Sequence, residues 1–262
     1  MNFGCPVEGC GRPCLKFHHF DPPWEKRHHH NPQGMIALCA EHADYADASR
    51  WTNDQLRQMK KNPFITRQSI MSNYGYLRRN TVCNIGNLAC GVKNILEIDG
   101  ERVIGFETDG DGFYRLNLLL RNSQCLEIFK MENGDWIANT GDLYDLICTA
   151  RGKKLSIVSK DQQTEIRMRF EDFTQDEFQK EFVKRGWELN SIQSFLSDIG
   201  SPQQIPVWSV SGCLRWKNRV ISIQERKIIE RYDEGGINEI EGNIFIKRPS
   251  ALSLSENQIS LR

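Results

Sequence analysis

All six histidines of this chain lie between residues 18 and 42, among a group of cysteines. Histidine has an ordinary pKa near neutral pH, and its neutral ring is a common metal ligand. Thiolates of cysteine are the other frequent ligands of zinc. A segment so rich in both residue types predicts metal binding or proton transfer. The histidines are His18, His19, His28, His29, His30 and His42, and the nearby cysteines are Cys5, Cys10, Cys14 and Cys39.

Two closely spaced pairs, Cys5-x4-Cys10 and Cys39-x2-His42, predict a structural zinc site. Tetrahedral zinc suits such pairs because each can clamp the ion from one tight turn while the chain between them makes an excursion. A small module also has little core of its own without a metal or another staple. Cys14 is the alternative ligand in place of Cys5 or Cys10.

The dipeptide His18-His19 is followed by "FDPP" and later by "NPQGMIALC". Over about residues 3–62 this combination resembles the HNH (ββα-metal) endonuclease family. Its members combine a cysteine pair, a His-His or Asp-His dipeptide followed by proline, an "LC" strand end and a metal-binding helix. The resemblance implies a nuclease that hydrolyses phosphodiester bonds in nucleic acid, DNA in preference to RNA. It assigns His18 as a ligand of a catalytic cation and His19 as the general base that activates water.

Asp47 lies where many members of that family have their last histidine. A carboxylate suits Mg²⁺ or Mn²⁺, so His18 and Asp47 with phosphate oxygens and water are the predicted catalytic metal site, with Asp44 as the backup ligand. Asp47 follows His42 by five residues, about 140° around a helix, so the zinc and the catalytic metal would use different faces of one helix. The triplet 28–30 is predicted to be an exposed loop. Possible phosphate-binding or accessory residues are Arg12, Lys26, Arg27 and His30.

The sequence departs from the family pattern at two positions. Gly34 stands where the family usually has the asparagine that braces the loop carrying the base, and Ala43 stands where a histidine or asparagine is frequent. These departures motivate a second hypothesis. In it, a zinc-stapled HNH-like head has lost catalysis and serves as a binding module on a β scaffold.

The rest of the chain predicts a mostly β structure. "WTNDQLRQMKKNPF" ends the first module as a short helix, with Thr52 or Asn53 as its cap. From about Val82, short alternating apolar runs are broken by Gly, Asp and Asn, as in "NILEIDGERVIGF". We therefore predict an α+β protein with a zinc-stapled ββα-metal head at 1–65, a linker at 66–81 and a β-rich domain at 82–262. That domain is a sandwich or an irregular solenoid with a helical insertion at about 174–199, and its role is regulation, docking of a protein partner or homo-oligomerisation.

Composition places the chain among soluble proteins. No apolar run approaches the roughly 20 residues of a membrane span, and no secretory signal is visible, so we expect a cytoplasmic protein that does not bind membranes. The net charge is zero, but residues 1–80 carry 11 basic against 7 acidic residues and residues 81–262 carry 23 against 27. This split favours phosphate contact at the head. By analogy with the layout of other nucleases, a bacterial or phage defence context is expected.

Overall fold

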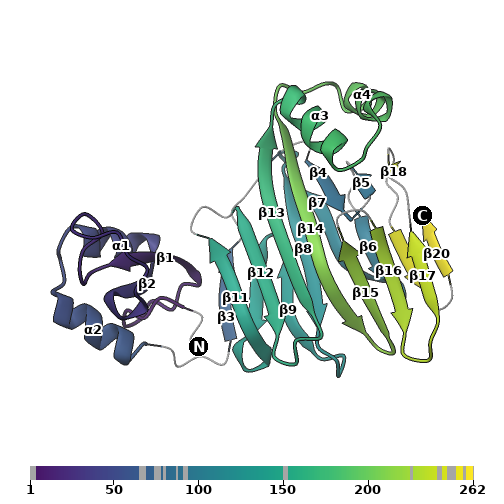
Figure 1. Cartoon of the computed structure of the whole chain (residues 1–262). Coiled ribbons are helices and arrows are strands. Elements are labelled where there is room, and N and C mark those ends of the chain that lie inside the picture. The colour runs from purple at the N-terminus through teal and green to yellow at the C-terminus, as the bar shows by residue number, and fades with distance from the viewer. Residues whose placement is uncertain are drawn as a thin grey trace.

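The computed structural model describes most of the chain, in two parts. A small head comprises residues 4–64, and a larger body comprises everything described from residue 69 onward (Figure 1). The described ranges are 4–64, 69–73, 78, 81–86, 88–90, 94–149, 153–224, 227–240, 244–246, 252–255 and 258–261. None of the helices in these ranges is long and apolar enough to cross a membrane.

The head is built from two strands followed by two helices. Strand β1 (Cys14–His19) pairs antiparallel with β2 (Met35–Cys39), and the one-turn helix η1 (Pro32–Gly34) leads into β2. Helix α1 (Ala40–Asp47) follows β2 directly. Helix α2 (Asn53–Lys61) begins at the predicted position, because Thr52 and Gln55 form a reciprocal capping box. The head has a small core of its own, formed by Cys5, Phe20, Ile36, Leu38, Cys39, Ala43, Ala46 and Leu56.

The body consists of two β-sheets. In the described residues the first has the order β17-β16-β15-β14-β13-β12-β11-β1-β2, with β4, β5 and β18 joined beside β14; the second has the order β20-β19-β6-β7-β8-β9-β10-β3. Besides β1 and β2 of the head, the first sheet contains β4 (Val82–Ile85), β5 (Leu88–Cys90), β11 (Leu143–Thr149), β12 (Lys154–Ser159), β13 (Glu165–Phe173), β14 (Ile205–Trp216), β15 (Arg219–Gln224), β16 (Lys227–Tyr232), β17 (Ile237–Ile240) and β18 (Ile244–Ile246). Those of the second are β3 (Ser69–Asn73), β6 (Asn94–Ile98), β7 (Glu101–Thr108), β8 (Tyr114–Arg121), β9 (Glu127–Glu132), β10 (Asp135–Asn139), β19 (Leu252–Ser255) and β20 (Gln258–Leu261), and the one-turn helix η2 (Thr140–Asp142) follows β10.

The two sheets pack face to face around one large core. Alternation along β13 buries every second side chain, as the sequence pattern predicts for a strand with one covered face. Phe106 of the second sheet meets Trp208 of the first with ring centroids 5.8 Å apart, and Phe170 packs edge-on against the same tryptophan. The chain is therefore α+β and mostly β, and of the two predicted architectures for the body the sandwich is the one observed.

A buried ion network ties the two sheets together. Arg219 on β15 is 1% exposed and donates to Glu230 on β16 at 2.8 Å. It also donates to Asp99, in the turn between β6 and β7 of the opposite sheet. A buried charge of this kind is tolerated because each partner is compensated by another.

Two helices cover one end of the sandwich (Figure 1). Helices α3 (Gln175–Lys184) and α4 (Leu189–Asp198) lie within the insertion predicted at 174–199. Their apolar faces form a second cluster with the ends of β4 and β14. This cluster contains Val82, Phe178, Phe182, Trp187, Ile192, Phe195, Leu196, Ile205 and Val207.

Two strand pairings bear on the predicted division into head, linker and body. Part of the stretch assigned to a linker is strand β3, which pairs with β10 at the edge of the second sheet. Strand β1 of the head also pairs in parallel with β11, so the head's strands extend the first sheet. Both pairings are made through backbone groups between distant segments, and side-chain periodicity does not report them.

Candidate metal centre and catalytic loop

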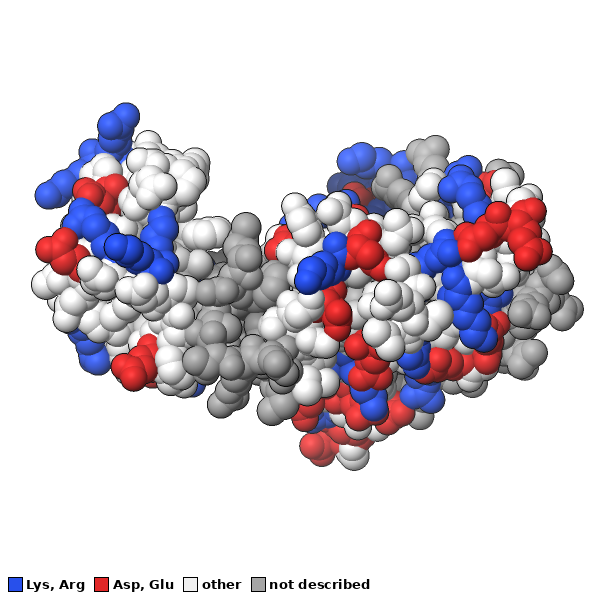
Figure 2. Space-filling model, turned by 90° about the horizontal axis from the view of Figure 1, so that it is seen from below, with Lys and Arg blue, Asp and Glu red and all other residues white. Residues whose placement is uncertain are grey.

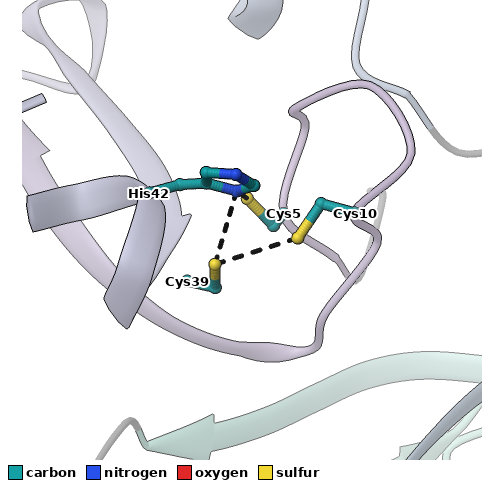
Figure 3. A group of neighbouring side chains, drawn as sticks. All are labelled: Cys5, Cys10, Cys39 and His42. Carbon is teal, nitrogen blue, oxygen red and sulfur yellow. Dashed lines mark hydrogen bonds between the residues drawn. The ribbon is translucent and has the colours of Figure 1, made fainter. Parts of the chain in front are cut away.

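Four ligand groups converge at one end of the head (Figure 3). Cys5 and Cys10 come from the loop before β1, Cys39 ends β2, and His42 lies in the first turn of α1. The loop is folded back by backbone hydrogen bonds, from Cys5 to Arg12 at 2.8 Å and from Cys10 to Val7 at 3.0 Å. These four are the residues that the spacing predicts, and in the described part of the chain they form the group that could hold a metal ion.

The separations of the ligand atoms fit tetrahedral zinc. The Nδ1 atom of His42 lies 3.3 Å from the sulfur of Cys5 and 3.5 Å from that of Cys39, and the sulfurs of Cys10 and Cys39 are 3.8 Å apart. A tetrahedron with zinc bonds of about 2.3 Å to sulfur and about 2.0 Å to nitrogen has edges of about 3.5 to 3.8 Å. The cluster is therefore compatible with structural zinc.

Burial keeps two of the clustered thiols protonated when no metal is bound. Burial raises the pKa of Cys5 to about 12, and repulsion from neighbouring thiolates adds to the effect although backbone hydrogen bonds oppose it. The pKa of Cys10 is raised as well, again mainly by burial. Thiols crowded in this way remain protonated at neutral pH until a metal replaces their protons.

Cys14 is not part of this cluster. Its Sγ atom lies 2.7 Å from that of Cys148 on β11, where the two residues are opposite each other in the β1–β11 pair. The alternative in which Cys14 replaces Cys5 or Cys10 therefore does not describe this structure.

His18 and Asp47, predicted to share a catalytic cation, lie in contact. The Nδ1 atom of His18, near the end of β1, is 2.8 Å from a carboxylate oxygen of Asp47, the last residue of α1. The histidine side chain is 14% exposed and the aspartate 61%, so the pair is open to solvent on one side. Asp44, the predicted backup, instead forms an ion pair with Lys16 at 2.8 Å.

His19, the predicted base, is the last residue of β1 and is surrounded by aromatic rings. Its centroid lies 4.8 Å from Trp24, 5.1 Å from His29 and 6.0 Å from His30. Its Nε2 atom is buried and has no hydrogen-bond partner among the described residues. Burial lowers the pKa of His19 and the charges of the neighbouring histidines lower it further, although a hydrogen bond with the backbone of His29 opposes them; the ring is therefore mainly neutral at pH 7.

The loop from residue 20 to residue 34 is braced by His29, which the sequence analysis placed in an exposed loop. The Nε2 atom of His29 donates to the carbonyl of Pro22 at 2.8 Å, and its Nδ1 atom accepts from the backbone of Asn31 at 3.0 Å. The carbonyl of Pro22 can only accept and the backbone N–H of Asn31 can only donate, so the ring is held in the tautomer with its proton on Nε2. His29 is half-buried, whereas His28 and His30 are exposed as predicted. A triplet of identical residues gives no sign of which one faces inward.

Gly34 has a steric role in the same loop. Its carbonyl accepts from the backbone of Phe20 at 2.9 Å and of Asp21 at 3.2 Å. A Cβ at Gly34 would lie 1.8 Å from the carbonyl oxygen of Asp21 and 3.2 Å from the ring of His29. This approach of the two backbone segments requires glycine at residue 34.

The other predicted residues lie around this loop and helix. Ala43 is 1% exposed and packs in the head core, which explains why no polar ligand stands there. Arg12 is engaged with Glu41 at 2.6 Å. Arg27 is exposed in the loop. Figure 2 shows basic and acidic side chains side by side on the head as well as on the body.

No family model, curated protein or solved structure matches this chain.

A hollow of about 640 Å³ lies on the outer face of the first sheet, away from the head site. Its lining includes basic and acidic side chains in similar number, together with serine hydroxyls. None of the residues predicted to bind metal or activate water lines it.

Proposed function

We propose that this protein is a metal-dependent endonuclease of the HNH type that hydrolyses phosphodiester bonds, with DNA as the preferred substrate. The observation that carries the proposal is the contact between His18 and Asp47 beside His19, on a unit of two strands and a helix. Two adjacent residues at a strand end point to different sides, which separates a ligand from a base.

His19 acts as the general base. Its neutral ring can accept a proton from water, because its lowered pKa keeps it unprotonated at pH 7. Its unpartnered Nε2 atom supports this role, since an unsatisfied buried nitrogen costs about 1 to 3 kcal/mol unless water or substrate binds to it. The brace at His29 holds the loop that packs against this ring.

His18 and Asp47 would hold a Mg²⁺ or Mn²⁺ ion. Their 2.8 Å separation is close to the distance of about 3 Å between adjacent ligands of an octahedral ion with bonds of about 2.1 Å. When bound, the ion polarises the phosphate and stabilises the leaving oxygen. Arg27 and His30, which are exposed in the loop, would contact the phosphate backbone.

The body supplies regulation, partner docking or oligomerisation in this proposal. Residues 81–262 carry 23 basic against 27 acidic residues, and the proposed catalytic residues lie in the head, so in this proposal the head makes the main contact with nucleic acid.

The test compares cleavage with binding. Zinc-loaded protein is incubated with plasmid, single-stranded DNA and RNA, with and without added Mg²⁺ or Mn²⁺. Cleavage that depends on the added ion is expected, and His19→Ala should lower it by about 10² to 10⁴-fold while binding persists. His28→Ala, at an exposed ring of the same loop, is the matched control. Binding without cleavage in all arms would support the docking-module hypothesis instead.

A further inference from the structure

Cys14 and Cys148 form a cysteine pair across the junction between head and body. They are directly opposite each other in the parallel β1–β11 pair and point to the same face. Their sulfurs lie 2.7 Å apart, well inside the about 3.5 to 4 Å at which nonbonded heavy atoms pack. Opposed positions on paired strands lie within the Cα separation of about 4.4 to 6.8 Å that a disulfide spans.

The environment of the pair differs from that of the zinc cluster. Cys148 is 4% exposed within the main core of the body, and Cys14 is half-buried against the same core. Neither residue belongs to the metal-ligand group, so zinc does not protect them. Cys14 is the more exposed residue of the pair, so a small oxidant would reach it before Cys148.

The geometry points to a reversible disulfide between Cys14 and Cys148 that forms on exposure to a peroxide and fixes the head to the body. The thiolate of Cys14 attacks one peroxide oxygen, and hydroxide leaves to give a sulfenic acid. The sulfur of Cys148 then attacks the sulfur of Cys14, and water leaves with the proton of Cys148. In the balance, two thiols and one hydrogen peroxide give one disulfide and two waters.

The hydrogen-bonded arrangement of the thiols supports this order of steps. The thiol of Cys148 lowers the pKa of Cys14, whereas the same contact and burial raise the pKa of Cys148. The more acidic and more exposed sulfur is therefore the one that meets the oxidant first.

The location gives the bond a structural consequence. Among the strands that the structure describes, β1–β11 is the pairing that joins head to body, and its register covers two residue pairs. The bond would reinforce this short ladder. His18 and His19 lie at the other end of the same strand, so oxidation would fix their position relative to the body. This consequence does not depend on which reaction, if any, the head catalyses.

Peptide mapping tests the proposal directly. Zinc-loaded wild-type protein is treated with hydrogen peroxide, free thiols are blocked, and a digest is examined without reduction. We expect a linked peptide containing Cys14 and Cys148, which dithiothreitol separates, and loss of these two thiols roughly tenfold faster than that of half-buried Cys213. A different cysteine partner for either residue, or loss no faster than at Cys213, would overturn the inference.

A second measurement detects the covalent link between head and body directly. A protease site placed within residues 65–68 allows head and body to be cut apart. After peroxide, the fragments should stay together on a denaturing gel without reductant and separate with it. Cys148→Ser should abolish the link, and Cys213→Ser should leave it; fragments of oxidised wild type that separate without reductant would refute the proposal.

Discussion

The substitution Gly34→Ala tests whether backbone contact at Gly34 holds the loop of residues 20–34 in place. The new Cβ would lie 1.8 Å from the carbonyl oxygen of Asp21, where ordinary contact is near 3.4 Å, so one of the two backbone segments must move by roughly 1.5 Å. That shift breaks the hydrogen bonds from Phe20 and Asp21 to the carbonyl of Gly34. Two hydrogen bonds at about 1 kcal/mol each, with about 1 kcal/mol of strain, give a destabilisation of about 3 kcal/mol for the head.

The assay is denaturant unfolding of the zinc-loaded protein, with zinc release as the probe of the head and far-ultraviolet circular dichroism as the probe of the body. We expect the unfolding midpoint of the head to fall to a lower denaturant concentration, while the midpoint of the body stays unchanged. Gly110→Ala is the matched control, because a Cβ there meets nothing within 4 Å. If both variants unfold alike, the steric reading of Gly34 is incorrect. In the cleavage assay of the proposed function, Gly34→Ala should resemble His19→Ala.

Three further outcomes are expected. Cys39→Ser should release the metal, measured by elemental analysis, and unfold the head while the body keeps its β spectrum; retained zinc at one ion per chain would contradict the ligand assignment. Glu230→Ala should lower the free energy of unfolding of the body by about 3 to 5 kcal/mol, because it leaves Arg219 with a buried and undercompensated charge; an effect below 1 kcal/mol in urea titration would refute this. His29→Ala should lower cleavage and loosen the loop to proteases, whereas His28→Ala should change neither.

Local spacing in the sequence accounts for much of the head. Four of its predicted ligands converge because each pair lies within one turn, and the short helix begins where Thr52 and Gln55 can cap each other. The contact between His18 and Asp47 joins a strand to the helix that packs on it, which the expected order of elements already implies. In the body, alternation predicts strands and their buried faces.

The remaining features depend on contacts between distant segments. The β1–β11 pair and the facing cysteines join residues 134 positions apart, and no periodicity within either strand encodes the partner. The role of His29 depends on the position of the Pro22 carbonyl after the loop has closed. Likewise, the need for glycine at residue 34 arises only from the approach of another backbone.

Because the head has a separate core, its folding equilibrium would depend on the concentration of free zinc. That core contains few large side chains, so the free energy of a bound metal ion would be a large share of the head's stability. Each tenfold rise in free zinc above the dissociation constant adds about 1.4 kcal/mol to a fold that binds one ion. The sandwich has its own extensive core, so its stability does not depend on zinc binding. The folded fraction of the head would therefore follow the zinc supply of its surroundings while the body stays folded throughout.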